Sequence, residues 1–210
     1  AVAGREWARL RYLAARHVPV PAPAACWTSP SGESGLVTVE IGDARSWKEV
    51  LLADRSPLAI ARSLTAAATL VMRAHEAGFL HADLHVGNFL VDPTGALTLI
   101  DVHRGAVRTR VSLRERLGNL ALLGFSLGSV LPRTAWRRLL RAYLDRLPKH
   151  GRAPDVRRCA EWVAGRIADL RARHLRRRTR RCLKNGTGFR VHETPDWRVY
   201  AVRSIDPGEV

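Results

Sequence analysis

Residues 81–101 read HADLHVGNFLVDPTGALTLID, and this stretch decides how the chain is interpreted. Two short apolar runs, NFLV and LTLI, flank the turn sequence DPTG, a pattern that predicts a β-hairpin. Asp83 lies in the loop that enters the hairpin, Asn88 near the start of its first strand, and Asp101 at the end of its second. We therefore expect these three side chains to converge on one point.

These residue types, in this order, suit phosphoryl transfer to a hydroxyl group. A carboxylate such as Asp83 can orient the hydroxyl and accept its proton. The amide oxygen of Asn88 and the carboxylate of Asp101 are hard ligands of the kind that Mg²⁺ prefers. The alternative is that Asp and Asn serve only as turn formers at the hairpin ends. Their joint spacing after a long predicted helix favours the catalytic interpretation.

Composition indicates a folded, globular chain. The 210 residues are 46% hydrophobic and 26% charged, enough for one large core or two small ones. No apolar run approaches the roughly 20 residues of a membrane-spanning helix, and the first ten residues have no signal-peptide core. The chain does not begin with Met, so we expect a fragment. Three cysteines without a CxxC pair predict neither a disulfide framework nor a zinc site, and they favour a cytoplasmic, reducing compartment.

The net charge of +16 is concentrated in the second half of the chain. Residues 1–101 contain 9 Lys/Arg and 10 Asp/Glu, whereas residues 102–210 contain 26 and 9. The second half should attract an anionic partner such as nucleic acid, an acidic membrane surface or a phosphorylated glycolipid. Arg outnumbers Lys 32 to 3, which suits bidentate phosphate contacts or reflects a GC-rich genome.

Periodicity and capping signals predict a mixed order of helices and strands. Ser56-Pro57 and the pair Ser112 and Glu115 are typical helix starts, and a proline-rich run ends the first helix. His75 lies on an apolar helix face and is interpreted as a core or edge histidine. We expect helices at about 4–16, 56–77, 113–131, 134–147 and 155–178, a strand at 36–41, and a terminal hairpin within 189–202.

The motif His-x-Asp-Leu-x-x-x-Asn followed by apolar-Asp resembles the catalytic and metal-binding loops of the protein-kinase-like superfamily. Within it, GFLHADLHVGNFLVDPTGALTLIDVHRG, residues 78–105, looks most like the lipopolysaccharide kinases, the Kdo and heptose kinases of the bacterial envelope. REWARLRYLAARHVPVPAPA, residues 5–24, is similar to that family's helix and proline-rich connection. The resemblance covers residues 4 to about 145.

The resemblance implies an α+β, protein-kinase-like fold. A mostly helical C-terminal lobe would carry the catalytic β-hairpin, and the N-terminal lobe would be truncated. Residues 1–42 would be a remnant of the nucleotide-binding lobe and hinge, 43–184 the helical catalytic lobe, and 185–210 a C-terminal hairpin or tail. The tail is interpreted as a plain hairpin or as the start of a second lobe with Arg203 at the lysine position.

By position in the resembled motif, Asp83 would be the catalytic base, and His81 would brace its loop. Asn88 and Asp101 would hold Mg²⁺ and so contribute to ATP binding.

The same resemblance implies nucleotide-binding residues near the N-terminus. Glu6 would pair with a phosphate-binding lysine, and Glu40, Ile41 and Gly42 would meet adenine through their backbone. Only five residues precede Glu6, and none of the three lysines lies in the expected place. Either strands are missing or the chain is a pseudokinase. Val-His also follows Asp101 where Phe-Gly is usual.

The implied function is ATP- and Mg²⁺-dependent phosphorylation of a sugar hydroxyl on a lipopolysaccharide core, Kdo or heptose, or on a similar envelope glycolipid. The alternatives are a small-molecule phosphotransferase of aminoglycoside or choline type and a non-catalytic pseudokinase or basic nucleic-acid-binding module. His103 and Arg104 would touch an anionic substrate or belong to a solvated loop. The basic run VHRGAVRTRV disfavours a cationic aminoglycoside.

The expected partners follow from charge. An anionic glycolipid or sugar would be the substrate, and the Arg-rich segment 171–184 would contact the inner face of the plasma membrane peripherally. No aromatic residue interrupts that segment, which disfavours nucleic acid. We expect a cytoplasmic protein, peripheral on the membrane, and the sequence leaves the oligomeric state open.

Overall fold

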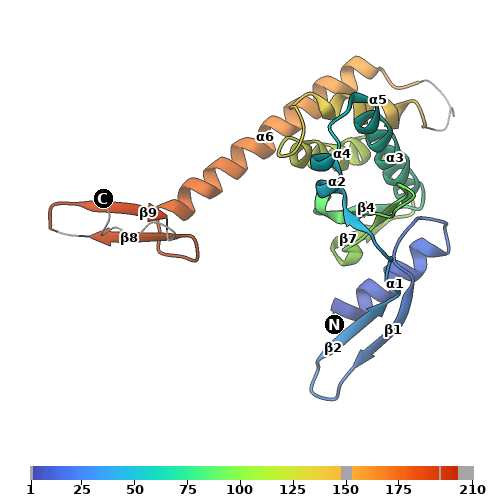
Figure 1. Ribbon diagram of the computed structural model, residues 1–210, viewed down its shortest axis with the longest axis horizontal. Coiled ribbons are helices and arrows are strands. Elements are labelled where there is room, and N and C mark those ends of the chain that lie inside the picture. Colours follow the sequence, from blue (N-terminus) through green and yellow to red (C-terminus); the bar gives the residue numbers. More distant parts are fainter. Residues whose placement is uncertain (1, 148–152, 194, 203–210) are drawn as a thin grey trace. The chain divides into compact units, whose positions relative to one another are not determined.

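The computed structural model of the protein describes residues 2–147, 153–193 and 195–202 (Figure 1). The chain forms two compact units, Ala1–Ile167 and Ala168–Val210. The long helix α6, Val156–Cys182, contributes to both. Within the described residues, no helix combines the length and the apolar composition that a membrane crossing requires.

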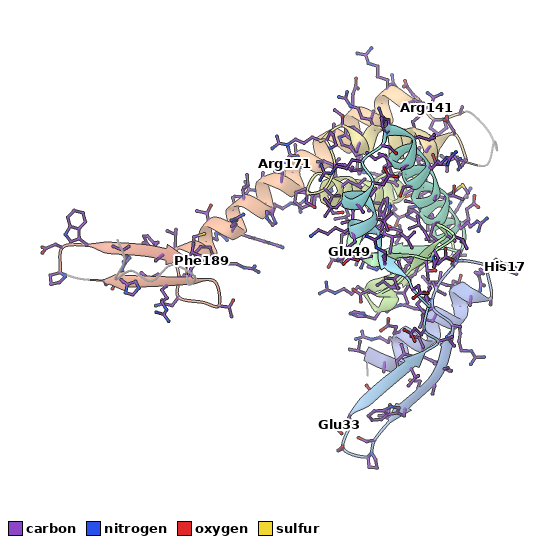
Figure 2. The ribbon with its side chains drawn as sticks, viewed as in Figure 1. His17, Glu33, Glu49, Arg141, Arg171 and Phe189 are labelled. Carbon is purple, nitrogen blue, oxygen red and sulfur yellow. The ribbon has the colours of Figure 1, made fainter. Side chains whose placement is uncertain are left out.

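The first unit opens with helix α1, Val2–Ala14, which packs against the hairpin of β1, Pro23–Thr28, and β2, Ser34–Thr38. Leu10 and Leu13 are its most buried side chains. The predicted helix is confirmed, shifted by two residues, and Glu33 lies in the turn between the strands (Figure 2).

One strand prediction in this region is confirmed in part, and one strand was missed. The strand predicted at 36–41 is β2, displaced to Ser34–Thr38, and β1 lies where only a connection was predicted. A proline is tolerated at the first residue of a strand because no ladder hydrogen bond is lost there, so the proline-rich sequence concealed β1.

N-cap side chains fix where the next two helices, α2 and α3, begin. Ser46 forms a capping box with Glu49 at the start of α2, Trp47–Ala53. Ser56 accepts a hydrogen bond from the Ala59 amide at the start of α3, Pro57–Glu76, as predicted.

The predicted hairpin is confirmed. Strand β5, Phe89–Val91, pairs antiparallel with β6, Leu97–Leu99, with Phe89 opposite Leu99. The two-residue strand β3, Arg45–Ser46, extends this sheet on the β5 side.

Shorter elements bracket the hairpin. Strand β4, Phe79–His81, precedes it, and β7, Gly105–Val107, follows it and pairs with β4. Two short 3₁₀ turns connect these strands to the hairpin: η1, Val86–Asn88, and η2, Val102–Arg104. The chain therefore enters and leaves the hairpin side by side, and this pairing was not predicted because three-residue strands are too short to show a period.

Helices α4, Leu113–Leu127, α5, Ala135–Leu144, and the beginning of α6 complete the core of the first unit. The capping box of Ser112 and Glu115 is confirmed. The helix predicted at 113–131 is confirmed in part, because it ends at Leu127, before the buried Leu131. Its leucines form a stripe of which Leu113 is exposed; the buried members are Leu117, Leu120, Leu123 and Leu127.

The second unit contains the rest of α6 and an antiparallel hairpin of β8, Phe189–Glu193, and β9, Arg198–Val202. The terminal hairpin is thus confirmed, whereas Arg203 lies outside the described residues. Arg171 projects from α6, and Phe189 begins β8 (Figure 2). The elements are of the predicted α+β class, and the lobe boundaries predicted at residues 42 and 184 stay predictions.

His75 joins three helices in the core of the first unit. Its Nε2 lies 3.0 Å from Asn119 Oδ1 on α4, and its Nδ1 lies 2.8 Å from the Tyr143 hydroxyl on α5. An amide oxygen only accepts, so Nε2 carries the proton and Nδ1 accepts from Tyr143. Burial lowers the pKa of His75 to about 4 and raises that of Tyr143 to about 12. His75 is therefore a core histidine, as the sequence indicated.

The low pKa of His75 predicts a loss of stability in mild acid. Between about pH 6.5 and 4, the unfolded chain binds a proton at this histidine and the native chain does not, so stability falls as the pH falls. The shift corresponds to at most about 3 kcal/mol. Urea unfolding across this window should show a shallower loss for His75→Gln than for the wild type. His17→Asn, at an exposed left-handed position, is the matched control; equal slopes for all three proteins would contradict the prediction.

Candidate active site

Asn88 directly precedes β5 and Asp101 follows β6 after one residue. Because the two strands are antiparallel, both residues lie at the end of the hairpin opposite its turn. The Ile100 amide donates to the Asn88 carbonyl at 2.8 Å, which continues the pairing past the strands. The buried Asn88 side chain accepts from the His85 amide at 2.7 Å and so closes the η1 turn. An amide oxygen has two acceptor positions, and this bond uses one of them.

His81 links the two segments that carry Asp83 and Asp101. Its Nδ1 accepts from the Asp83 amide at 3.2 Å. Because Nδ1 accepts, Nε2 carries the proton and donates to the Asp101 carbonyl at 3.0 Å. Burial is the largest cause that lowers the pKa of His81, and this favours the neutral form that makes both contacts. These contacts are the geometry that a bracing residue needs.

Asn119 holds His81 in turn, and the sequence analysis missed it. Its Nδ2 donates to the His81 carbonyl at 2.5 Å, and its Oδ1 accepts from the His81 amide at 3.3 Å. The same Oδ1 accepts from His75. An Asn inside a leucine stripe is the signal that could have revealed it, because a buried amide needs hydrogen-bond partners.

The predicted catalytic base Asp83 and the predicted metal ligand Asp101 are each paired with a basic residue of η2. Arg104 Nη1 contacts Asp83 Oδ2, and His103 Nδ1 contacts Asp101 Oδ1. The side chains of Asp83 and Arg104 are 50% and 54% exposed. Asp101 itself lies in the left-handed region with φ of 60°, a conformation that Asp tolerates better than most residues. The two acids are therefore oriented but accessible.

A cavity of about 390 Å³ lies beside this hairpin, between α1, β2 and the strand β5. Glu6, Glu40, Ile41 and Asp101 line it, so the structure brings these four predicted residues together. His81, Asp83, Asn88 and Gly42 are not among its lining residues. The other lining residues are Leu10, Pro21, Leu36, Thr38, Val39, Ala44, Leu90 and Ile100. Its size and its mixed polar and apolar walls suit a small ligand such as a nucleotide.

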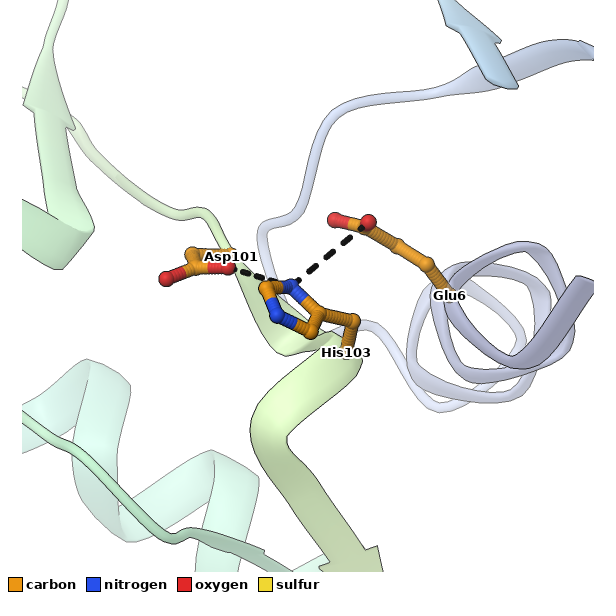
Figure 3. A group of neighbouring side chains, drawn as sticks. All are labelled: Glu6, Asp101 and His103. Atoms are coloured by element: carbon orange, nitrogen blue, oxygen red, sulfur yellow. Dashed lines mark ion pairs between the residues drawn. The ribbon is translucent and has the colours of Figure 1, made fainter. Parts of the chain in front are cut away.

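Glu6 and Asp101, which line the cavity, form a group of possible metal ligands together with His103 (Figure 3). One ligand atom from each lies within 4.8 Å of the others, and Glu6 Oε2 is 3.8 Å from His103 Nδ1. Burial raises the pKa of Glu6, while the neighbouring His103 acts in the opposite direction. Two carboxylates here fit Mg²⁺, which prefers oxygen ligands. Sequence reasoning predicted Asp101 as a ligand and missed His103 in this group.

Comparison with protein families matches residues 1–143 to the lipopolysaccharide kinase (Kdo/WaaP) family. Similar curated proteins include 3-deoxy-D-manno-octulosonic acid kinases from three bacteria. That of Xylella fastidiosa (strain M12) is 32% identical over 135 residues, covering 56% of this chain and 47% of the relative. That of Xanthomonas euvesicatoria pv. vesicatoria (strain 85-10) is 37% identical over 127 residues, covering 58% and 48%. That of Stenotrophomonas maltophilia (strain K279a) is 35% identical over 117 residues, covering 53% and 45%.

The chain spans about half the length of the curated relatives it matches. Among solved structures, one described as a divergent kinase lacking the glycine-rich loop, which regulates membrane ultrastructure of the Toxoplasma parasitophorous vacuole, is similar over 72% of this chain and 49% of its own. Its identity is 14% and the TM-score is 0.41, so no conclusion about this chain rests on that likeness.

Removal of the Asn119 amide should destabilise the first unit. Asn119→Ala leaves the buried amide and carbonyl of His81 without these partners, at a cost of about 2–4 kcal/mol. Chemical denaturation measures this loss. Ser129→Ala is the control. It removes an exposed hydroxyl that donates to the Ser126 carbonyl, and it should lower the free energy of unfolding by less than about 0.5 kcal/mol. If the two variants lose the same free energy of unfolding, the hydrogen bonds from Asn119 to the His81 backbone do not contribute to stability as predicted.

Proposed function

The chain belongs to the lipopolysaccharide kinase (Kdo/WaaP) family, and we propose that it forms the catalytic part of an ATP- and Mg²⁺-dependent kinase for a sugar hydroxyl of the lipopolysaccharide core. Its fold is accordingly the protein-kinase-like α+β fold. One observation supports the proposal above the others: His81 joins the loop of Asp83 to the backbone of Asp101, and Asp101 lines the cavity that Glu6 and Ile41 also line.

In the proposed reaction, Asp83 orients the acceptor hydroxyl and takes its proton. The hydroxyl oxygen then forms a bond to the γ-phosphorus of ATP, the bond from that phosphorus to ADP breaks, and ADP leaves. The exposed carboxylate of Asp83 can be reached by a large glycolipid, which a buried base would not allow. His81 keeps this loop in register with Asp101 through its two hydrogen bonds.

The cavity would hold the nucleotide. Backbone groups of Glu40, Ile41 and Gly42 would meet adenine, and Glu6 would face the phosphate end together with Asp101. Asn88 and Asp101 would hold the metal, because each offers an oxygen ligand. Bound Mg²⁺ would supply charge neutralisation on the phosphates.

The acceptor is proposed to be an acidic sugar of the envelope, 3-deoxy-D-manno-octulosonic acid (Kdo) or a heptose glycolipid. The relatives are named for Kdo, and the second half of the chain carries the excess positive charge. The Arg-rich part of α6 would hold the protein peripherally on the inner face of the plasma membrane.

Two substitutions test the catalytic roles in the protein expressed at the full length that its gene encodes. Asp83→Asn should lower kcat for Kdo-lipid phosphorylation about 10²–10⁴-fold, since general-base catalysis is lost, with ATP affinity unchanged. Asp101→Ala should abolish the Mg²⁺ dependence of ATP binding measured by calorimetry. Asp145→Asn, in an exposed ion pair with Arg141 at the end of α5, is the matched control.

These outcomes separate a kinase from a pseudokinase. ATP binding without phosphoryl transfer to any Kdo or heptose glycolipid would contradict the catalytic proposal. A folded protein that binds no nucleotide with Mg²⁺ would contradict the assignment of the cavity as well.

The membrane role of α6 is tested with vesicles. Replacing Arg176, Arg177 and Arg178 with Gln should weaken binding to vesicles of an anionic phospholipid about 100-fold, at roughly 1 kcal/mol for each residue near the surface. Binding should also decrease with salt.

Substitution of three exposed arginines on α5, Arg137, Arg138 and Arg141, is the matched control, because it removes the same charge from the first unit. Equal weakening by both triple variants would show that net charge alone acts. Tight binding to duplex DNA without vesicle binding would favour the nucleic-acid alternative.

A further inference from the structure

Arg104 has no role in the proposed reaction, although it lies against the proposed base. Its guanidinium contacts the carboxylate of Asp83, the proposed base. While that pair persists, the guanidinium occupies Asp83 Oδ2, one of the two oxygens that could accept the proton of the acceptor hydroxyl. An arginine that merely stabilised the fold could occupy many other positions on this surface.

The backbone around Arg104 is fixed from several sides. Its carbonyl accepts from the Ala82 amide at 3.0 Å, so Arg104 is anchored beside the residue that precedes the base. The preceding carbonyl, of His103, accepts from the side chain of Arg9 on α1. The following Gly105 packs against the ring of Phe79, where any larger side chain would collide. The guanidinium therefore extends from a rigid turn, and only the side chain itself has freedom to move.

Most of the hydrogen-bonding capacity of Arg104 is unused. Among the residues that the structure describes, its one recorded side-chain partner is Asp83. A guanidinium has five N–H donors in a planar fork that matches a carboxylate or phosphate. The side chain is 54% exposed, so these donors are open to a ligand that approaches Asp83 from solvent.

We propose that Arg104 binds an anionic group of the acceptor, a carboxylate or a phosphate, beside the hydroxyl that Asp83 deprotonates. The inference rests on the proposed function and names the class of acceptor: a sugar that bears a negative charge close to its reactive hydroxyl. When the acceptor's anion takes the guanidinium, Asp83 is released from its ion pair and is free to accept the proton. The same arginine thus selects the substrate and frees the base only when that substrate is present.

The surroundings favour an acceptor anion over the phosphates of the nucleotide. Neither Arg104 nor Asp83 is among the residues that line the cavity, which Asp101 borders instead. Residues 102–116 contain five arginines and a single acid, Glu115. This local charge attracts anionic sugars and repels cationic ones.

Direct binding gives the first test, without ATP. Calorimetry on the full-length protein should show that free Kdo binds at least about tenfold more tightly than its uncharged methyl ester, in line with charge-assisted bidentate contacts. Arg104→Gln should remove this preference, and Arg104→Lys should restore part of it. A sugar phosphate that shows the same dependence on Arg104 identifies phosphate as an accepted anion, whereas one that does not restricts the site to carboxylates.

Arg108→Gln is the matched control. Arg108 lies four residues further along, is 55% exposed and is paired with Glu115. It should leave the preference for Kdo intact. If Arg108→Gln and Arg104→Gln weaken binding equally, or if the wild type binds acid and ester alike, the proposal is wrong. Unfolding temperatures of the variants show whether each is folded.

Kinetics separates this proposal from that of the kinase itself. With ATP, Arg104→Gln should raise KM for the acceptor about tenfold or more and leave KM for ATP unchanged. A rise in KM for ATP with acceptor KM unchanged would assign Arg104 to the nucleotide and overturn the proposal. If the wild type transfers no phosphate but discriminates acid from ester through Arg104, the anion site stands and the kinase assignment fails.

Discussion

The imidazole of His81 is the point on which the proposed site depends. It accepts from the amide of Asp83 and donates to the carbonyl of Asp101, so one ring fixes the separation of two segments that lie on opposite sides of the hairpin in sequence. Only the neutral ring with its proton on Nε2 can make both contacts. Burial lowers the pKa of His81 and so favours the neutral form. The burial of this ring in the core therefore helps to maintain the two hydrogen bonds that hold the site together.

The helices support this brace through a continuous polar network. Asn119 on α4 holds both backbone groups of His81, His75 on α3 donates to Asn119, and Tyr143 on α5 donates to His75. Every member is buried or largely buried and has a partner, which is what makes such a network stabilising inside a low-dielectric core. The helices of the first unit therefore do more than cover the core: three of them each supply one side chain to a chain of hydrogen bonds that ends at His81, beside the loop of Asp83.

Local signals in the sequence were enough for the hairpin and the helix starts. Ser56 and Ser112 cap their helices through residues three positions away, and a tight turn sets the pairing of β5 with β6. What the sequence could not show depends on contacts between distant residues. The bonds of Asn119 to His81 and the approach of Glu6 to His103 join segments 38 and 97 positions apart, and no period or spacing encodes such pairs. The resemblance to a kinase family supplied Glu6 and Asp101 but not their meeting with a histidine.

The pairing of both proposed catalytic acids with basic residues has an energetic consequence. The side chains of Asp83 and Arg104 are about half exposed, and those of Asp101 and His103 about a third. Ion pairs at such exposure contribute only about 0–1 kcal/mol, because water competes for both partners. A buried pair would cost several kcal/mol to separate, and substrate binding would have to supply that energy. These weak pairs instead keep the carboxylates oriented, and they can be exchanged for the charges of substrate at little cost. His81 fixes the backbone of Asp83 and Asp101, whereas their side chains are partly exposed. This combination allows the carboxylates to be oriented and yet to exchange their basic partners for substrate.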